Sequence, residues 1–297
     1  MLFRSEVQSV EYVHPNSILK IVTAPNDPLY SQQADLNNDG INGKKRGADI
    51  DAPEAWQVTT GSSSVVVGII DTGIDYNHPD LINNIWTNPG ETGLDEQGRD
   101  KRFNGIDDDK NGYVDDYRGW DFVNNDNDPM DDNRHGTHVA GTIGAVGNNG
   151  VGITGINWEV RMVGLKFLSG AGSGALSDAV KAIEYATMMN IPITNNSWGG
   201  GGYEATLEAA IKAAGDKGFL FVAAAGNDSN NNDATPSYPA SYKLPNIISV
   251  AAVDSDDSLA NFSNYGNTSV HVAAPGVDIL STLPNNTYGT LSGTSMA

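Results

Sequence analysis

Val65-Val-Val-Gly-Ile-Ile70 is the stretch that decides the fold, because it is short, apolar and rich in β-branched residues. Such a run is typical of a strand that is buried on both faces. Four similar runs follow along the chain: Val160–Leu165, Ile191–Thr194, Phe219–Ala224 and Ile247–Val253. The sequence therefore predicts a sheet that is covered on both sides.

Helical patterns lie between these runs. One is expected over Ser177–Asn190 behind a serine cap, another over Tyr203–Lys217, and Asp51-Ala-Pro-Glu54 is typical of a helix start. Each longer helix places a set of residues on one face: Val180, Ile183 and Thr187 in the first, and Leu207, Ala210, Ile211 and Ala214 in the second. This alternation predicts an α/β fold, with a mostly parallel sheet and helices on both faces. In such sheets the active crevice lies beyond the carboxyl ends of the strands.

Composition limits the classes of function. The 297 residues include 37 acidic and 17 basic side chains, a formal net charge of −20. This excludes a nucleic-acid binder, because no basic surface is available to neutralise phosphates. No stretch approaches the roughly 18 apolar residues of a membrane span, so we expect no membrane partner. The absence of cysteine excludes disulfides, thiol catalysis and cysteine-zinc sites.

Four polar residues stand where catalytic groups are expected. Asp71 directly follows the first predicted strand, His135 opens a run of small residues, and Ser295 lies in a glycine-rich stretch. Each taken alone is typical of a turn, a structural histidine or a loop. Together they could supply a nucleophile, a base and the group that orients the base. Asn227 follows another strand and could donate its amide to a developing oxyanion.

The strings around these residues resemble the three signatures of the subtilisin-like serine proteases. They are Ile69-Ile-Asp-Thr-Gly-Ile-Asp75, His135-Gly-Thr-His-Val-Ala-Gly141 and Gly293-Thr-Ser-Met-Ala297, in the family's chain order. Three further strings add to the resemblance: His78-Pro-Asp-Leu81, Asn196-Ser-Trp-Gly-Gly200 and Ala223-Ala-Ala-Gly-Asn227. The resemblance implies a subtilisin-like fold and a secreted serine endopeptidase with an acyl-enzyme intermediate. It implies that Asp71 orients the base, His135 is the base, Ser295 the nucleophile and Asn227 the oxyanion donor.

The resemblance also implies how a peptide substrate binds. In this family the peptide lies as an added strand between two backbone segments. The matching segments are Gly172-Ser173-Gly174 and Ser197-Trp198-Gly199. Their glycines leave the backbone edge open, and we expect Trp198 to form a wall of a side-chain pocket.

His135 and His138 allow a different interpretation, as a metal pair on one helical face with Asp71 as a third ligand. That hypothesis leaves the strings around Ser295 and Asn227 without a role. We therefore interpret His138 as a packed structural histidine.

The acidic segment 91–133 interrupts the alternation of strands and helices. Within it, Asp107, Asp109 and Asn111 have the spacing of a calcium loop, Gly112 allows the turn, and the carbonyl of Tyr113 can add a ligand. Arg118 stands where an EF-hand has glutamate, so the shell has to be completed by one of two neighbouring acids, Asp115 or Asp116. A solvated acidic loop without an ion is the alternative. Asp35-Leu-Asn-Asn-Asp-Gly40 has a similar opening without later acids and is interpreted as a turn.

The family resemblance implies a second structural calcium site. Its side-chain ligands are carried over as Asp27, Asp80 and Asn149, and its carbonyl ligands as Gly147, Val151 and Ile153. Calcium at both sites would provide cross-links that a chain without cysteine cannot form.

Both ends differ from the family pattern. Residues 1–22 resemble the tail of an inhibitory propeptide, and 23–297 a peptidase domain in which the helices that follow the nucleophile are missing. We therefore expect a fragment of a secreted precursor, inactive as it stands, that is a monomer and whose partners are a peptide substrate and its own propeptide. A fragment or pseudoenzyme that only binds peptides, and a metal-dependent hydrolase, are the alternatives.

Overall fold

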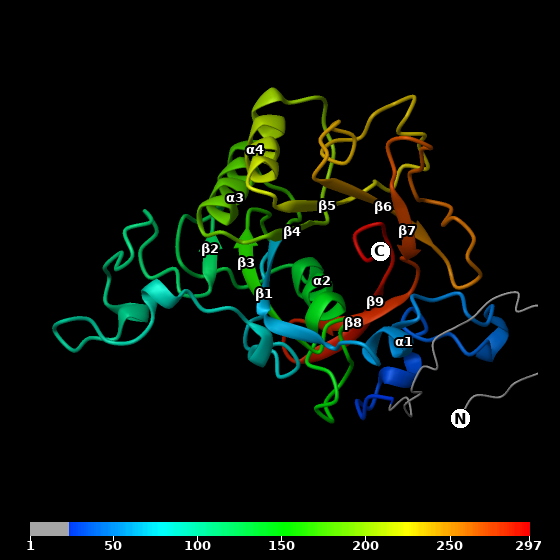
Figure 1. Cartoon of the computed structure of the whole chain (residues 1–297), viewed down its shortest axis with the longest axis horizontal. Coiled ribbons are helices and arrows are strands. Elements are labelled where there is room, and N and C mark those ends of the chain that lie inside the picture. The colour runs from blue at the N-terminus through cyan, green and yellow to red at the C-terminus, as the bar shows by residue number, and fades with distance from the viewer. Residues whose placement is uncertain (1–23) are drawn as a thin grey trace, which may run out of the picture.

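The computed structural model describes residues 24–297, so the segment 1–22, interpreted as a propeptide tail, lies outside the described residues. The described chain forms a seven-stranded sheet of order β2-β3-β1-β4-β5-β6-β7, in which all neighbouring strands are parallel (Figure 1). The strands are β1 Gly61–Asp71, β2 Gly119–Asp121, β3 Glu159–Lys166, β4 Ile193–Asn196, β5 Leu220–Ala224, β6 Ile247–Val253 and β7 Val272–Pro275. An antiparallel hairpin follows, formed by β8 Ile279–Leu283 and β9 Thr287–Leu291.

Helices cover both faces of this sheet. The α-helices are α1 Ala52–Trp56, α2 His135–Gly144, α3 Leu176–Met188 and α4 Ala205–Asp216, and short 3₁₀ turns lie at Tyr30–Gln32, Ile41–Gly43, Ile82–Asn84, Pro89–Glu91 and Lys101–Phe103. Figure 1 shows α3 and α4 side by side, with α2 and the β8–β9 hairpin apart from them across the sheet. The predicted α/β fold with a parallel sheet and helices on both faces is confirmed.

The central strand β1 contributes side chains to two hydrophobic cores, one on each face of the sheet. Ile70 belongs to the core that contains the apolar residues of α3 and α4, whereas Val67 and Ile69 belong to the core under α2. Alternate side chains of a strand point to opposite faces, so a strand buried on both sides must be apolar at nearly every position. Asp71 is the last residue of this strand and is brought to the carboxyl edge of the sheet.

Local details differ from the sequence prediction. The helix α3 begins at Leu176 with Ala175 as its cap, so Ser177 lies inside the first turn rather than before it. Asp51 precedes α1 in a left-handed conformation (φ 52°), and its side chain makes no capping hydrogen bond. The edge strand β2 lies within the acidic segment 91–133 and was not predicted, because three residues are too few to show a pattern.

Among the described residues, no helix has the length and apolar character needed to cross a bilayer.

Candidate active site

Asp71 and His135 meet where β1 ends and α2 begins. Oδ1 of the buried Asp71 lies 2.8 Å from Nδ1 of His135 and also accepts a hydrogen bond from the backbone N–H of Thr72 (2.7 Å). The close approach depends on Gly136, because a Cβ there would collide with the carbonyl oxygen of Gly73. The geometry holds the imidazole with Nδ1 facing the carboxylate and the other ring nitrogen free to act as a base.

A second buried carboxylate, Asp131, fixes this arrangement. Its Oδ1 accepts a hydrogen bond from the Thr72 hydroxyl (2.9 Å), and its Oδ2 accepts from the N–H (2.9 Å) and hydroxyl (2.6 Å) of Thr137. The Thr72 hydroxyl in turn accepts a hydrogen bond from the N–H of Gly136 (2.9 Å). One side chain therefore joins the end of β1 to the first turn of α2. Sequence reasoning missed Asp131, because its contact with Thr72 joins residues that lie 59 positions apart in the chain.

Opposing effects set the pKa of His135. Burial disfavours the charged imidazolium and lowers the pKa, but the hydrogen bond and negative charge of Asp71 favour it, and the charge of Asp131 adds to this. The carboxylates prevail, so the pKa of His135 is raised above its usual 6.5. A base in this range can accept a proton near neutral pH.

Asn227 lies after β5 with its amide oriented by a neighbouring threonine. Its Oδ1 accepts hydrogen bonds from the backbone N–H and the hydroxyl of Thr294, each at 2.9 Å. Because the oxygen is held in this way, the NH₂ group is left to donate elsewhere. Sequence reasoning missed Thr294, although it directly precedes Ser295.

Ser295 lies in the same cavity as Asn227. This cavity of about 340 Å³, the Ser295 cavity, is also lined by Ser197, Gly226 and Thr294. The hydroxyl of Ser295 donates to the carbonyl oxygen of Ser197 (3.1 Å), and Ser197 Oγ donates to the carbonyl oxygen of Ser295 (2.9 Å). Among residues 24–297 no hydrogen bond joins Ser295 to His135. His135 lines a neighbouring pocket, which shares Ser197, Trp198, Gly199 and Gly200 with the Ser295 cavity.

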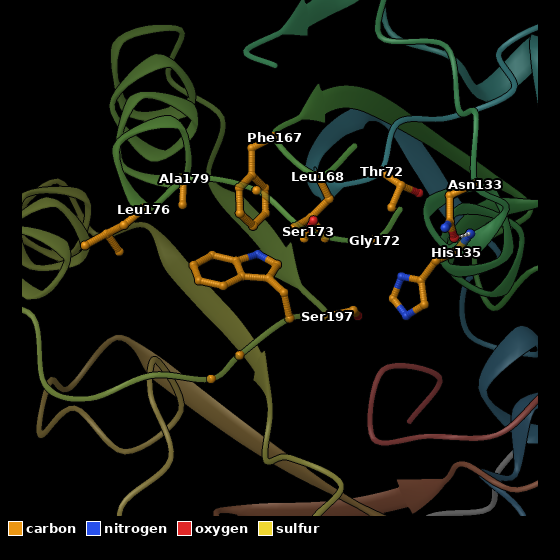
Figure 2. A pocket seen from close by; sticks show the side chains of 14 residues that line it. Thr72, Asn133, His135, Phe167, Leu168, Gly172, Ser173, Leu176, Ala179 and Ser197 are labelled. Atoms are coloured by element: carbon orange, nitrogen blue, oxygen red, sulfur yellow. Dashed lines mark hydrogen bonds between the residues drawn. The ribbon is translucent and has the colours of Figure 1, made fainter. Parts of the chain in front are cut away.

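The two segments expected to bind substrate face each other across an adjoining pocket of about 450 Å³, the Trp198 pocket (Figure 2). Figure 2 shows His135, Asn133 and Thr72 at one end, Leu176 and Ala179 at the other, and Phe167 and Leu168 between them. The other lining residues are Gly172, Ser173, Gly174, Ser197, Trp198, Gly199 and Gly200. The indole of Trp198 packs edge-on against the rings of Phe167 (4.9 Å between centroids) and Phe221 (6.4 Å).

Three carboxylates of the acidic segment converge, and we call them the Glu91 cluster: Glu91, Asp109 and Asp116. Their oxygens lie within 4.8 Å of one another, and Glu91 and Asp116 are fully buried. Burial raises the pKa of Glu91 to about 7, helped by the negative charges of Asp116 and Asp109 and opposed by the N–H groups of Asp108 and Asp109. Oε2 of Glu91 is buried without a hydrogen-bond partner among the described residues. A cation at this position would satisfy that oxygen and relieve the repulsion.

The remaining predicted ligands of this segment lie differently. Asp107 accepts hydrogen bonds from the N–H groups of Asn111 (3.0 Å) and Gly112 (2.8 Å), and Asp115 accepts from the N–H of Gly105. Nδ2 of Asn111 donates to Asp116 (2.9 Å), while the ring of Tyr113 packs on Tyr185. The cluster therefore contains two predicted residues and Glu91, which the loop spacing does not reveal because it lies 16 residues before Asp107.

The residues carried over for the second calcium site also lie together. Asp27 accepts hydrogen bonds from the backbone N–H groups of Asn148 (2.7 Å) and Asn149 (3.1 Å). Asp80, fully buried, accepts from Nδ2 of Asn149 (2.8 Å) and from the N–H of Ile153 (3.0 Å). Gly147 and Val151 belong to the same loop. Burial raises the pKa of Asp80, and these hydrogen bonds oppose the rise.

His138 lies one turn after His135 in α2 but contacts different elements. Its Nε2 lies 2.9 Å from the carbonyl oxygen of Ile279 and 3.2 Å from that of Gly289, so it ties α2 to both strands of the β8–β9 hairpin. Burial lowers its pKa to about 4, although these carbonyls oppose the shift. The group of convergent acidic and histidine ligands found among residues 24–297 contains neither His135 nor His138.

Comparison with known proteins agrees with this geometry. The model of the subtilase family matches residues 62–297. The chain is 41% identical over 289 residues to the thermophilic serine proteinase of Bacillus sp. (strain AK1), covering 97% of this chain and 60% of that protein. It is 37% identical to thermitase of Thermoactinomyces vulgaris (92% of this chain, 81% of that protein) and 37% identical to subtilisin-like protease 1 of Plasmodium falciparum (88% and 40%). The chain thus spans between about two fifths and four fifths of these relatives. It belongs to the subtilase family.

Proposed function

We propose that this chain carries the catalytic centre of a serine endopeptidase, with Asp71, His135 and Ser295 as the triad. The observation that carries the proposal is the 2.8 Å contact between Asp71 Oδ1 and His135 Nδ1. His135 lines the Trp198 pocket, which adjoins the Ser295 cavity through the shared segment Ser197–Gly200. Membership of the subtilase family and the names of the serine proteinases that resemble the chain support it.

In the proposed mechanism, Oγ of Ser295 attacks the carbonyl carbon of the scissile peptide bond while Nε2 of His135 accepts its proton. Asp71 holds Nδ1 and stabilises the imidazolium that forms. The free NH₂ group of Asn227 donates a hydrogen bond to the oxyanion. His135 then gives its proton to the leaving amine, and water hydrolyses the acyl group from Ser295 by the same steps in reverse.

We propose that the substrate peptide lies between Gly172–Gly174 and Ser197–Gly199. The glycines of both segments are exposed, which leaves backbone groups available for pairing with an extended chain. The Trp198 pocket then receives an apolar side chain, because its walls include Phe167, Leu168 and Leu176.

The test is active-site labelling of the full-length protein with a fluorophosphonate probe. We expect labelling at Ser295, complete loss in Ser295→Ala, and no change in Ser177→Ala, an exposed serine in the first turn of α3. Peptide binding without labelling would support a protein that only binds peptides. Peptidase activity that persists in Ser295→Ala but is lost with chelators would support a metal-dependent hydrolase.

We further propose that calcium stabilises the fold at the Glu91 cluster and at the Asp27–Asp80–Asn149 site. The donor atoms fit this ion, because they are carboxylate and amide oxygens, and Oε2 of Glu91 lacks another partner. A ligand that binds the folded state alone stabilises it by roughly 2.7 kcal/mol at a hundredfold excess over Kd. We expect EGTA to lower Tm and calcium, but not magnesium, to restore it.

A pair of variants separates ion binding from loop stability. Asp109→Ala should lower Tm more in calcium than in EGTA, where only its hydrogen bonds with Asn88 and Asn111 are lost. Asp107→Ala removes hydrogen bonds to backbone N–H groups of the same loop, so it should lower Tm equally with and without calcium. Identical melting of the unaltered protein in calcium and in EGTA would show that neither site holds the ion.

We also propose that the protein is a secreted monomer and that residues 1–22 belong to an inhibitory propeptide of a 23–297 peptidase domain. The resemblance to subtilases supports this proposal. The measurement is the N-terminal sequence and the mass of the protein recovered from culture medium. Cleavage near residue 22 supports the proposal, and an unprocessed intracellular protein contradicts it.

A further inference from the structure

Lys166 is a buried cation next to the candidate active site that the proposed mechanism does not use. It is the last residue of β3, lies directly opposite Asp71 in the β1–β3 register, and its side chain is 2% exposed. On its other side it lies opposite Asp121 of β2. Burying an ammonium group is costly unless each of its protons finds an acceptor.

All three protons of Lys166 are used, and each acceptor lies in a different functional segment. Nζ donates to the carbonyl oxygen of Thr72 (2.7 Å), to the carbonyl oxygen of Leu168 (3.0 Å) and to Oδ1 of Asp132 (2.6 Å). Thr72 directly follows Asp71, Leu168 lines the Trp198 pocket, and Asp132 lies three residues before His135. The side chain of Asp132 is 57% exposed, so the ammonium group reaches the surface only through this partner.

The backbone strengthens this connection. The N–H groups of Phe167 and Leu168 both donate to the carbonyl oxygen of Asp71, at 3.0 and 3.2 Å. The wall of the Trp198 pocket is therefore joined to the strand end that carries Asp71 by the backbone on one side and by Lys166 on the other. An apolar side chain could fill the same space in the sheet, but it could not hold the three segments at fixed distances.

We propose that Lys166 is a positioning residue that holds the Trp198 pocket in register with the Asp71–His135 pair. It touches neither substrate nor a reacting atom. Its effect is to place a peptide that fills the pocket at the correct distance from the base, so the side chain in the pocket contributes to kcat as well as to binding. The inference rests on the proposed peptidase function.

The test compares Lys166→Met with Lys166→Arg and with a matched control, Lys181→Met. Lys181 is an exposed lysine of α3 in an ion pair with Asp178, so its loss should leave activity unchanged. Two chromogenic substrates are used, a tetrapeptide anilide long enough to reach the Trp198 pocket and the dipeptide anilide that lacks this part. Thermal melting in calcium confirms that each variant is folded.

We expect Lys166→Met to lower kcat/KM for the tetrapeptide by at least about tenfold, mainly through kcat, since small displacements in an active site have effects of this size. The kcat/KM for the dipeptide should fall by a smaller factor, so the ratio of the tetrapeptide kcat/KM to the dipeptide kcat/KM decreases. Lys166→Arg, which keeps the charge and the donors, should recover part of that ratio.

Other results would overturn the inference. An equal loss on both substrates would mean that Lys166 supports only the fold or the catalytic pair. Unchanged kcat/KM values for both substrates in a folded Lys166→Met variant would show that the residue has no role in catalysis or in substrate positioning. If Lys166→Met does not fold, Asp132→Asn decides: it weakens one of the three hydrogen bonds, and the substrate ratio should fall in the same direction. A protein that cleaves neither substrate and is not labelled at Ser295 would overturn the proposed function, which is a separate and recognisable outcome.

Discussion

His135 is the residue whose protonation should control the rate. Its pKa is raised because the hydrogen bond and charge of Asp71, with the charge of Asp131, outweigh burial. Only the neutral imidazole can accept the proton of Ser295, so kcat/KM should fall as the pH drops through the pKa of His135 in the free enzyme. We predict that the acid limb of the kcat/KM profile has its midpoint above pH 6.5. A midpoint clearly below this value would show that burial, rather than the two carboxylates, dominates at His135.

The same residue makes a contribution to stability with the opposite pH dependence. A histidine whose folded pKa lies above its unfolded value of about 6.5 stabilises the protein fully below that value, and the contribution is lost as the pH rises through the folded pKa. Activity should therefore rise over the pH range in which this part of the stability disappears.

Asn227 should act on the transition state rather than on substrate binding. Thr294 holds its oxygen, so the NH₂ group is free to meet the negative charge that develops on the carbonyl oxygen. We predict that Asn227→Ala lowers kcat by roughly 10²–10³ with little change in KM. Ser229→Ala, in the exposed loop that follows, serves as the control. An effect confined to KM would place Asn227 outside the oxyanion site.

At the scale of single residues, the sequence predicts the candidate catalytic residues better than it predicts the residues that hold them in place. The positions of Asp71, His135, Asn227 and Ser295 could be proposed because local strings surround them. Their supporting partners could not, because Asp131, Thr294 and Lys166 act through hydrogen bonds that exist only when distant segments meet.

Among the elements, the acidic segment 91–133 should respond most strongly to conditions. Without an ion, Glu91 has its pKa raised from 4.5 to about 7, mainly by burial. The folded state then binds more protons than the unfolded state between these values, so stability should fall as the pH rises from about 4.5 to 7. We predict this slope for Tm in EGTA and a flatter slope in Glu91→Gln, which is neutral throughout.

Calcium should reverse the slope, because the ion binds the charged carboxylate and competes with protons. Glu159→Gln, at the exposed start of β3, is the matched control and should leave both slopes unchanged. A slope in EGTA that persists in Glu91→Gln would assign the titration to another group.

The elements themselves were predictable wherever burial imposes a pattern on the sequence. The runs that became β1, β3, β4, β5 and β6 are rich in apolar residues because these strands lie inside the sheet and contribute side chains to its hydrophobic cores. Edge positions impose no such requirement, which is why β2 gave no signal although it extends the sheet beside β3. The convergence of Glu91 with Asp109 and Asp116 was not predictable either, because an irregular loop without a repeating sequence pattern brings the three residues together.

For the whole molecule, the net charge of −20 should make stability depend on ionic strength. Repulsion between like charges destabilises the compact state, and it is screened when the Debye length shrinks from about 10 Å at 0.1 M to about 3 Å at 1 M salt. We predict that Tm in EGTA rises with added choline chloride, whose cation is too large for the carboxylate sites. An unchanged Tm would show that charges of opposite sign are already balanced locally.

The chain order of the candidate triad has a consequence for folding kinetics. Asp71 and Ser295 are separated by 224 positions, and β1 pairs with β3 and β4, which are far along the chain. Contacts between distant segments form late and slowly, because loop closure must come before the pairing that stabilises it. A nascent copy therefore has no assembled nucleophile and base, while its unpaired strands are extended peptides of the kind that the cleft is proposed to bind. The hazard during maturation is then digestion of slow-folding copies by finished ones, and it should grow with protein concentration.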